Sequence, residues 1–228
     1  MLRRAFAILV FLLPTAPAFA QAPAPPAATL RAVFFEVGPN DVSRVSAALK
    51  DYRQATMKAN GVVRVDVLQQ VGRPNHFAIE EAWRDAASLE AHKSAAETKK
   101  LDETVQATRV SPFDERLLAA VSVAAPSGAI PAQAVYVLTH ADSIPDGREK
   151  ASAALTDLAS TARQEPGNVM YQVAVQTNRN NHFTVIEAWR DEKAYDAHVT
   201  AGNTKKFRDT FGPFSGALFD ERIYKSIS

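Results

Sequence analysis

The chain contains two copies of one sequence pattern, 106 residues apart. NHFAIEEAWRDAASLEAH occupies residues 75–92 and NHFTVIEAWRDEKAYDAH occupies residues 181–198, with ten of the eighteen positions identical. The same offset relates the two FDER motifs at 113–116 and 219–222. Because the offset is constant over so long a stretch, the chain consists of two copies of a whole domain and not of short solenoid repeats.

Each copy predicts the same order of secondary structure. Runs rich in β-branched and aromatic residues at 32–37 and 134–139 predict the first strands. Matching AVFF (32–35) to AVYV (134–137) implies that the offset slips by about four residues here. The first copy then predicts an amphipathic helix that Asp41 caps and Asn60-Gly61 ends, strands at 62–71 and 76–84, a second helix after Asp85, and a last strand that contains 113–118.

The order β-α-β-β-α-β is that of a ferredoxin-like domain, with helices on one face of a four-stranded sheet. The other face is bare and apolar, so it needs a partner. We therefore expect an α+β fold in which the two copies pair with each other as a pseudo-dimeric α+β barrel. The predicted domains are residues 30–121 and 133–228, joined by a linker at 122–132.

The N-terminal segment predicts export. Residues 1–20 combine a basic start, a short apolar run and an Ala-Phe-Ala end, which is typical of a cleaved signal peptide. Residues 21–29 form a Pro/Ala tether. The expected location is the bacterial periplasm or the medium, with no membrane contact after cleavage, and an uncleaved membrane anchor is the alternative.

Composition excludes several classes of function. Removal of Arg3 and Arg4 with the signal peptide would change the formal net charge from +1 to −1, which offers no electrostatic basis for binding nucleic acid. The chain has no cysteine, which excludes thiol chemistry and thiolate zinc sites. No glycine-rich phosphate loop or hydrolase elbow is present.

The repeated motif places a carboxylate among apolar side chains. Alternate strand residues share a face, which groups Glu81 and Trp83 with Phe77, and Glu187 and Trp189 with Phe183. Desolvation there would raise the pKa of the glutamate and suit it to proton transfer. The structural alternative is a glutamate that binds a buried donor, such as the indole N–H.

Histidines complete the motif. The helical phase groups His92 with Leu89 and Ala96, so the imidazole of His92, like that of His198, should point toward the sheet. Each is a candidate general base or a half-buried structural histidine. His76 and His182 lie at the start of their strands and on the face opposite Glu81 and Glu187. We therefore expect each of them to contact the other domain. The spacing of these residues predicts no metal site.

The two stretches FAIEEAWRDAASLEAH and FTVIEAWRDEKAYDAH resemble the Glu-x-Trp…His motif of antibiotic biosynthesis monooxygenase (ABM) domains, which belong to the dimeric α+β barrel superfamily. The resemblance covers essentially the whole mature chain, twice. It implies a catalytic role for Glu81, His92, Glu187 and His198, and a substrate-binding role for the aromatic residues Trp83, Phe77, Trp189 and Phe183.

Family resemblance also implies a range of activities. Some members oxidise quinols and polycyclic phenols with dioxygen and without a cofactor, and others degrade haem. We therefore expect a cofactor-independent monooxygenase acting on a quinol or a similar hydroxylated aromatic. The alternatives are a non-catalytic module that binds a small hydrophobic ligand such as haem, and a protein in which the Glu-Trp-His sets are purely architectural.

Overall fold

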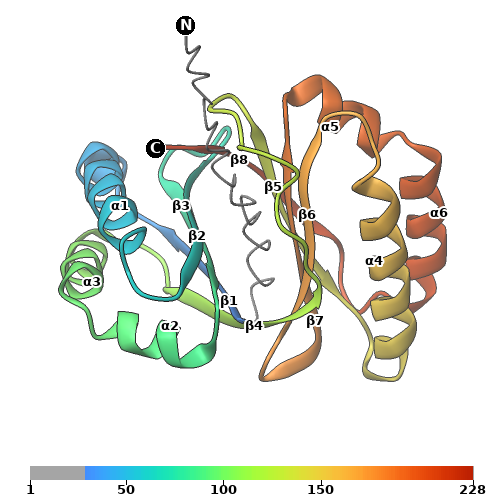
Figure 1. Ribbon diagram of the computed structural model, residues 1–228, viewed down its shortest axis with the longest axis horizontal. Coiled ribbons are helices and arrows are strands. Elements are labelled where there is room, and N and C mark those ends of the chain that lie inside the picture. The colour runs from blue at the N-terminus through green and yellow to red at the C-terminus, as the bar shows by residue number, and fades with distance from the viewer. Residues whose placement is uncertain (1–28, 228) are drawn as a thin grey trace, which may run out of the picture.

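The computed structural model describes residues 29–227, and the predicted signal peptide and nearly all of the predicted tether lie outside this range. The strands form one closed barrel in the order β1-β3-β2-β8-β5-β7-β6-β4. Figure 1 shows helices α1, α2 and α3 on one flank of this barrel and helices α4, α5 and α6 on the other. The predicted α+β barrel of two tandem ferredoxin-like copies is confirmed.

The two copies contain equivalent elements. The first copy contains β1 (Thr29–Glu36), α1 (Val42–Thr56), β2 (Val62–Gln70), β3 (His76–Trp83), α2 (Ala86–Lys93), α3 (Ala96–Thr108) and β4 (Asp114–Ser122). The second contains β5 (Val135–Asp142), α4 (Arg148–Ala162), β6 (Asn168–Gln176), β7 (Arg179–Trp189), α5 (Glu192–Val199), α6 (Gly202–Phe211) and β8 (Asp220–Ser226). Short 3-10 turns lie at Pro39–Asp41, Pro145–Gly147 and Gly212–Phe214.

The copies join through their sheet edges. Strand β4 pairs with β1 of its own copy and with β6 of the other, while β8 pairs with β5 and with β2. Within residues 29–227, this closure leaves none of the eight strands at an open sheet edge. The inner sheet faces, which were expected to be bare, share one apolar core whose larger side chains are Leu30, Phe34, Leu68, Leu118, Tyr136, Leu138, Met170, Ile186 and Tyr224.

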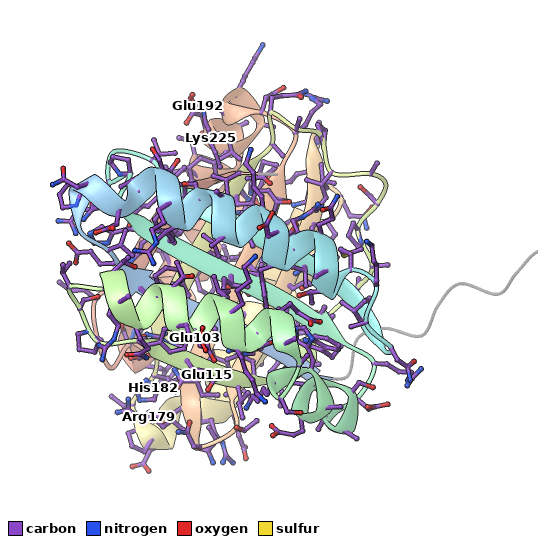
Figure 2. All side chains as sticks on the ribbon, turned by 90° about the vertical axis from the view of Figure 1, so that its left-hand side faces the viewer. Glu103, Glu115, Arg179, His182, Glu192 and Lys225 are labelled. Carbon is purple, nitrogen blue, oxygen red and sulfur yellow. The ribbon has the colours of Figure 1, made fainter. Side chains whose placement is uncertain are left out.

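Each copy has a second apolar layer between its sheet and its helices. In the first copy the stripe Val45, Leu49 and Tyr52 of α1 packs here with Phe77 and Ile79 of β3. Figure 2 shows α1 and α3 side by side over this sheet, with Glu115 of β4 labelled near α3. None of the helices within residues 29–227 is both long and apolar enough to cross a membrane. The strand face that carries Glu81 and Trp83 of the repeated motif lies in this outer layer and not in the barrel interior.

The strand register corrects the predicted slip of the repeat. Thr29 is opposite Trp83 in the first copy and Val135 is opposite Trp189 in the second, so the offset is 106 here as well. The match of AVFF to AVYV was wrong because short runs of small and β-branched residues resemble one another in any register. As a result, Val137 occupies the position of Arg31.

The predicted second helix is two helices in each copy. It begins as predicted, since Asp85 accepts a hydrogen bond from the Ser88 amide at 2.7 Å and caps α2. It ends at Lys93, where the Thr98 hydroxyl donates to the His92 carbonyl at 2.8 Å. Ala96 starts a new helix with a new phase and is exposed, so the expected grouping of Ala96 with His92 was wrong.

Three smaller features differ from the sequence prediction or refine it. Asp41 precedes α1 as predicted, but its side chain makes no capping hydrogen bond. Gly61, with a φ of 84°, lies in the turn after α1, where only glycine adopts this conformation easily. Strand β4 includes Ser122, so the segment between the last strand of the first copy and β5 is residues 123–134.

Candidate functional site

Glutamate and tryptophan of the motif form the same contact in both copies. The Trp83 indole Nε1 donates to Glu81 Oε2 at 2.9 Å, and the Trp189 indole donates to Glu187 Oε2 at 2.8 Å. Both glutamates are buried against the helices. The structural alternative for the glutamate, acceptance of an indole N–H, therefore accounts for one oxygen of each carboxyl group.

The histidines lie where the spacing predicts. His92 is buried beside Trp83 with ring centroids 4.8 Å apart, and His198 stacks on Trp189 at 4.6 Å. Glutamate, tryptophan and histidine are thus brought together twice. Because they come from β3 and α2, or from β7 and α5, the fold and not the local sequence determines their distances.

In the first copy, the space beside this motif is filled by charged and polar side chains. Arg31 Nη1 lies 3.2 Å from Glu81 Oε1, and its Nε lies 2.6 Å from Glu115 Oε1. The Tyr52 hydroxyl donates to Glu81 and lies 3.1 Å from His92 Nε2. Glu81 therefore binds three donors in a closed network.

In the second copy, the equivalent of this space is open. At the offset of 106, Val137, Leu158 and Ala162 replace Arg31, Tyr52 and a threonine, so the arginine and both hydroxyl groups are absent. A cavity of about 280 Å³ lies here between the sheet and helices α4–α6. Its lining is Thr139, Leu155, Leu158, Tyr171, Val185, Glu187, His198, Val199, Thr204, Phe207, Arg208, Phe219 and Glu221.

Burial shifts the two ionisable groups of the motif in this cavity toward their neutral forms. Desolvation raises the pKa of Glu187 to about 8, the Trp189 hydrogen bond opposes this, and the Glu221 and Glu165 carboxylates reinforce it. Desolvation lowers the pKa of His198, against the raising effect of Glu165. At pH 7, Glu187 is therefore mostly protonated and His198 is neutral, with His198 Nε2 3.8 Å from Glu187 Oε2.

Several residues of the cavity were missed at the sequence level. Glu221 lines the cavity and accepts a hydrogen bond from the Tyr195 hydroxyl. It belongs to the repeated FDER motif, which was a signal for it. The Thr139 hydroxyl is buried and has no hydrogen-bond partner among the described residues. No sequence pattern distinguished it, because the first copy has Val33 at this position.

The predicted aromatic wall lies outside the cavity lining. Phe77 stacks on Phe35 with centroids 5.7 Å apart, deep in the first outer core. Phe183 is likewise buried in the second outer core and is not among the residues that line the cavity. Trp83 and Trp189 are fully buried behind their glutamates. Phe207, Phe219 and Tyr171 supply the aromatic surface of the cavity.

The remaining histidines lie away from the cavity. His76 Nε2 is 3.4 Å from Glu36, and His182 Nδ1 is 2.9 Å from Asp142. His140 Nδ1 is 2.7 Å from Arg116 Nη1 in the barrel interior. Within residues 29–227, no group of three or more His, Cys, Asp or Glu side chains is arranged to hold a metal ion.

Sequence comparison identifies the family. The sequence profile of the antibiotic biosynthesis monooxygenase (ABM) family matches residues 30–104 and again residues 134–210. The chain therefore belongs to the ABM family, as two tandem domains, and this membership supports a monooxygenase-type function. Comparison with curated protein sequences yields no significant match.

Solved structures share the complete tandem fold. A candidate monooxygenase of Fusobacterium nucleatum superposes with a TM-score of 0.82 at 15% identity, over 89% of this chain and 94% of that chain. A candidate monooxygenase of Lactobacillus acidophilus gives 0.76 at 15% identity, over 89% and 95%. An anthrone oxidase-like protein gives 0.69 at 15% identity, over 90% and 93%. At this identity the likeness shows the fold alone.

Proposed function

We propose that this protein is a cofactor-independent monooxygenase that oxidises a hydroquinone or similar hydroxylated aromatic with dioxygen, and that its reaction takes place in the cavity of the second copy. The observation that carries the proposal is that the His198 imidazole and the Glu187 carboxyl group lie 3.8 Å apart in one partly enclosed cavity, where burial favours the neutral form of each. Such a pair supplies a base and an acid at neutral pH.

The residues suit a reaction in which the substrate itself supplies the electrons. His198 Nε2 accepts the phenolic proton, and the phenolate that results is reducing enough to give one electron to dioxygen. Recombination forms a ring C–O bond to a peroxide, whose terminal oxygen takes the proton held by His198. Cleavage of the O–O bond with a proton from Glu187 releases water, and the proton of the ring C–H bond that breaks as the new carbonyl forms returns to Glu187. The balance is hydroquinone plus O₂ giving hydroxyquinone plus H₂O, so dioxygen takes up four electrons and the substrate loses four.

Cavity size and polarity favour a small aromatic with oxygen at two positions. The volume of about 280 Å³ lies just below the ~300–1,000 Å³ of typical ligand pockets. Val137 is opposite Glu187, and Thr139 lies two residues further along the same strand. The Thr139 hydroxyl has no hydrogen-bond partner among the described residues, so it can bind a second substrate oxygen. A tetrapyrrole is much larger than this space, which disfavours the alternative of haem binding.

Oxygen consumption by the purified protein tests the proposal. We expect uptake that depends on a member of a hydroquinone and naphthol panel, persists with a chelator, and places one atom of ¹⁸O₂ in the product. Glu187→Gln keeps the size of the side chain and removes the proton, so uptake should fall by about 100-fold while substrate binding is retained. Binding of an aromatic without uptake across the panel would favour the non-catalytic ligand-binding alternative.

The cellular location is part of the same proposal. We propose that residues 1–20 are removed on export and that the mature protein acts in the periplasm, because the segment has the order of regions typical of a signal peptide. Cell fractionation followed by N-terminal sequencing should find a periplasmic protein that starts at Gln21. Retention in the membrane at full length would support the uncleaved anchor instead.

A further inference from the structure

Outside the cavity, a carboxylate holds the far side of the His198 ring. His198 Nδ1 lies 3.0 Å from Glu165 Oε2 and 3.1 Å from Glu165 Oε1. The Asn203 side-chain amide donates to Glu165 Oε1 at 2.5 Å and to the Thr161 hydroxyl at 3.1 Å. Glu165 follows the end of α4, so the contact joins the α4–β6 loop to helices α5 and α6.

This contact determines where the proton of the neutral imidazole resides. A carboxylate accepts, so Nδ1 carries the hydrogen that it donates to Glu165. Nε2 then has a free electron pair, and this atom is the one that faces Glu187 in the cavity. Glu165 therefore selects the tautomer that a general base requires, in the way that a carboxylate orients a catalytic histidine elsewhere.

The first copy lacks this arrangement. Ala59 occupies the position of Glu165 at the offset of 106. His92 Nδ1 has no hydrogen bond, since its nearest carboxylate oxygen, Glu97 Oε1, is 3.6 Å away. His92 Nε2 instead lies within 3.1 to 3.3 Å of three hydroxyl groups, those of Tyr52, Thr56 and Thr98. The carboxylate on Nδ1 and the open Nε2 occur together in the second copy.

We propose that Glu165 is a positioning residue that, held by Asn203, fixes His198 as the Nδ1-protonated tautomer and so makes Nε2 the base of the second-copy cavity. The inference rests on the proposed function for its catalytic consequence, but not for the tautomer, which is a property of the free protein.

Other charged and titratable groups also face the imidazole. Glu187 approaches from β7 and Glu221 from β8, Arg208 comes from α6, and the Tyr171 ring of β6 lies 5.7 Å from the His198 ring. Among the charged groups around His198, Glu165 makes the shortest contact. Its removal should therefore lower the pKa of His198 further, because the carboxylate stabilises the imidazolium form.

Nitrogen NMR of the ¹⁵N-labelled mature protein tests the assignment directly, since the two ring nitrogens have different shifts when protonated. We compare the wild type with Glu165→Gln, which removes the charge, and Glu165→Ala, which removes the contact. Glu97→Gln is the matched control, because it changes the carboxylate nearest to His92. Thermal unfolding of each variant shows that it is folded, and oxygen uptake is measured from pH 5 to pH 9.

We expect an Nδ1-protonated His198 in the wild type and in Glu97→Gln. Glu165→Ala should lose this preference, and Glu165→Gln should move the acid limb of the rate profile to lower pH. The maximal rate should fall on the order of 10- to 100-fold in Glu165→Ala and stay unchanged in Glu97→Gln. An Nε2-protonated His198 in an active wild type would overturn the role of Glu165. The expected tautomer in a protein that never consumes oxygen would overturn the proposed reaction.

Discussion

Arg31 and Val137 occupy equivalent positions on the first strands of the two copies, and this difference, together with that between Tyr52 and Leu158, distinguishes a filled space beneath the helices from an open one. Arg31 is paired with Glu81 at 3.2 Å and with Glu115 at 2.6 Å. Val137 is apolar, and a cavity of about 280 Å³ lies beside its cross-strand partner Glu187. The tandem duplication has thus produced one copy with a closed polar network and one with an open site.

Substitution of Val137 by arginine should close the second site. The new guanidinium would lie near Glu187 and Glu221, which correspond to the two carboxylates that bind Arg31. We expect a folded protein whose substrate affinity and oxygen uptake both fall by at least about tenfold, because the positive charge also disfavours the proton on Glu187. Val137→Leu is the size control and should retain most activity. Full activity in Val137→Arg would place the reaction elsewhere.

Loss of Arg31 should cost stability without a comparable loss of activity. Arg31→Met leaves the fully buried Glu81 without its cation, while Lys93 stays 3.7 Å from Glu115, and breaking a buried pair in this way costs about 3–5 kcal/mol. Urea unfolding measures the loss. Arg31→Met/Glu81→Gln should recover part of it, since the buried charge is gone. A single variant as stable as the wild type would mean that the network contributes little.

The pH dependence of kcat/KM follows from the two shifted groups. Activity needs neutral His198, whose pKa lies below its ordinary 6.5, and protonated Glu187, whose pKa is about 8. The rate should therefore rise with pH below about 6.5, stay high near neutrality and fall above about 8. These two limits report apparent pKa values of the coupled pair of His198 and Glu187 and not of either residue alone. A rate that keeps rising through pH 9 would show that ionised Glu187 is the base.

Trp189 sets the alkaline limb of that profile. Its indole N–H donates to Glu187 at 2.8 Å and stabilises the carboxylate, so Trp189→Phe should raise the pKa of Glu187 further and move the alkaline limb upward. Trp83→Phe removes the corresponding donor from Glu81 and is the matched control. Its profile should coincide with that of the wild type. Equal shifts in both variants would contradict a single working site.

Much of the architecture is readable from the sequence, because the repeat and the strand periodicity are local features. So are the helix caps Asp85 and Asp191, the second of which accepts a hydrogen bond from the Ala194 amide at 2.9 Å. The meeting of Glu187 with His198 also follows, since both the strand face and the helix start were predicted. The cavity itself is not readable. It depends on Val137 and Leu158, which are unremarkable apolar residues until the register shows that their counterparts are Arg31 and Tyr52.

The split of the second helix limited the prediction in the same way. A hydrogen bond from the Thr98 hydroxyl to the His92 carbonyl lies at the end of α2, and nothing in the apolar periodicity of the sequence marks that break. Glu165 was missed because the loop after α4 brings it to His198 from 33 residues away in sequence. Contacts of this kind depend on the closed fold and are not encoded in any local pattern.

Oxygen uptake by two matched variants, His198→Gln and His92→Gln, tests the central claim most directly. The account predicts that, with a hydroquinone that the wild type oxidises, His198→Gln loses roughly 100-fold or more of the rate while His92→Gln stays within about twofold, provided that both are folded by circular dichroism. Equal losses in both variants, or a loss confined to His92→Gln, would contradict a reaction centred on the open cavity of the second copy.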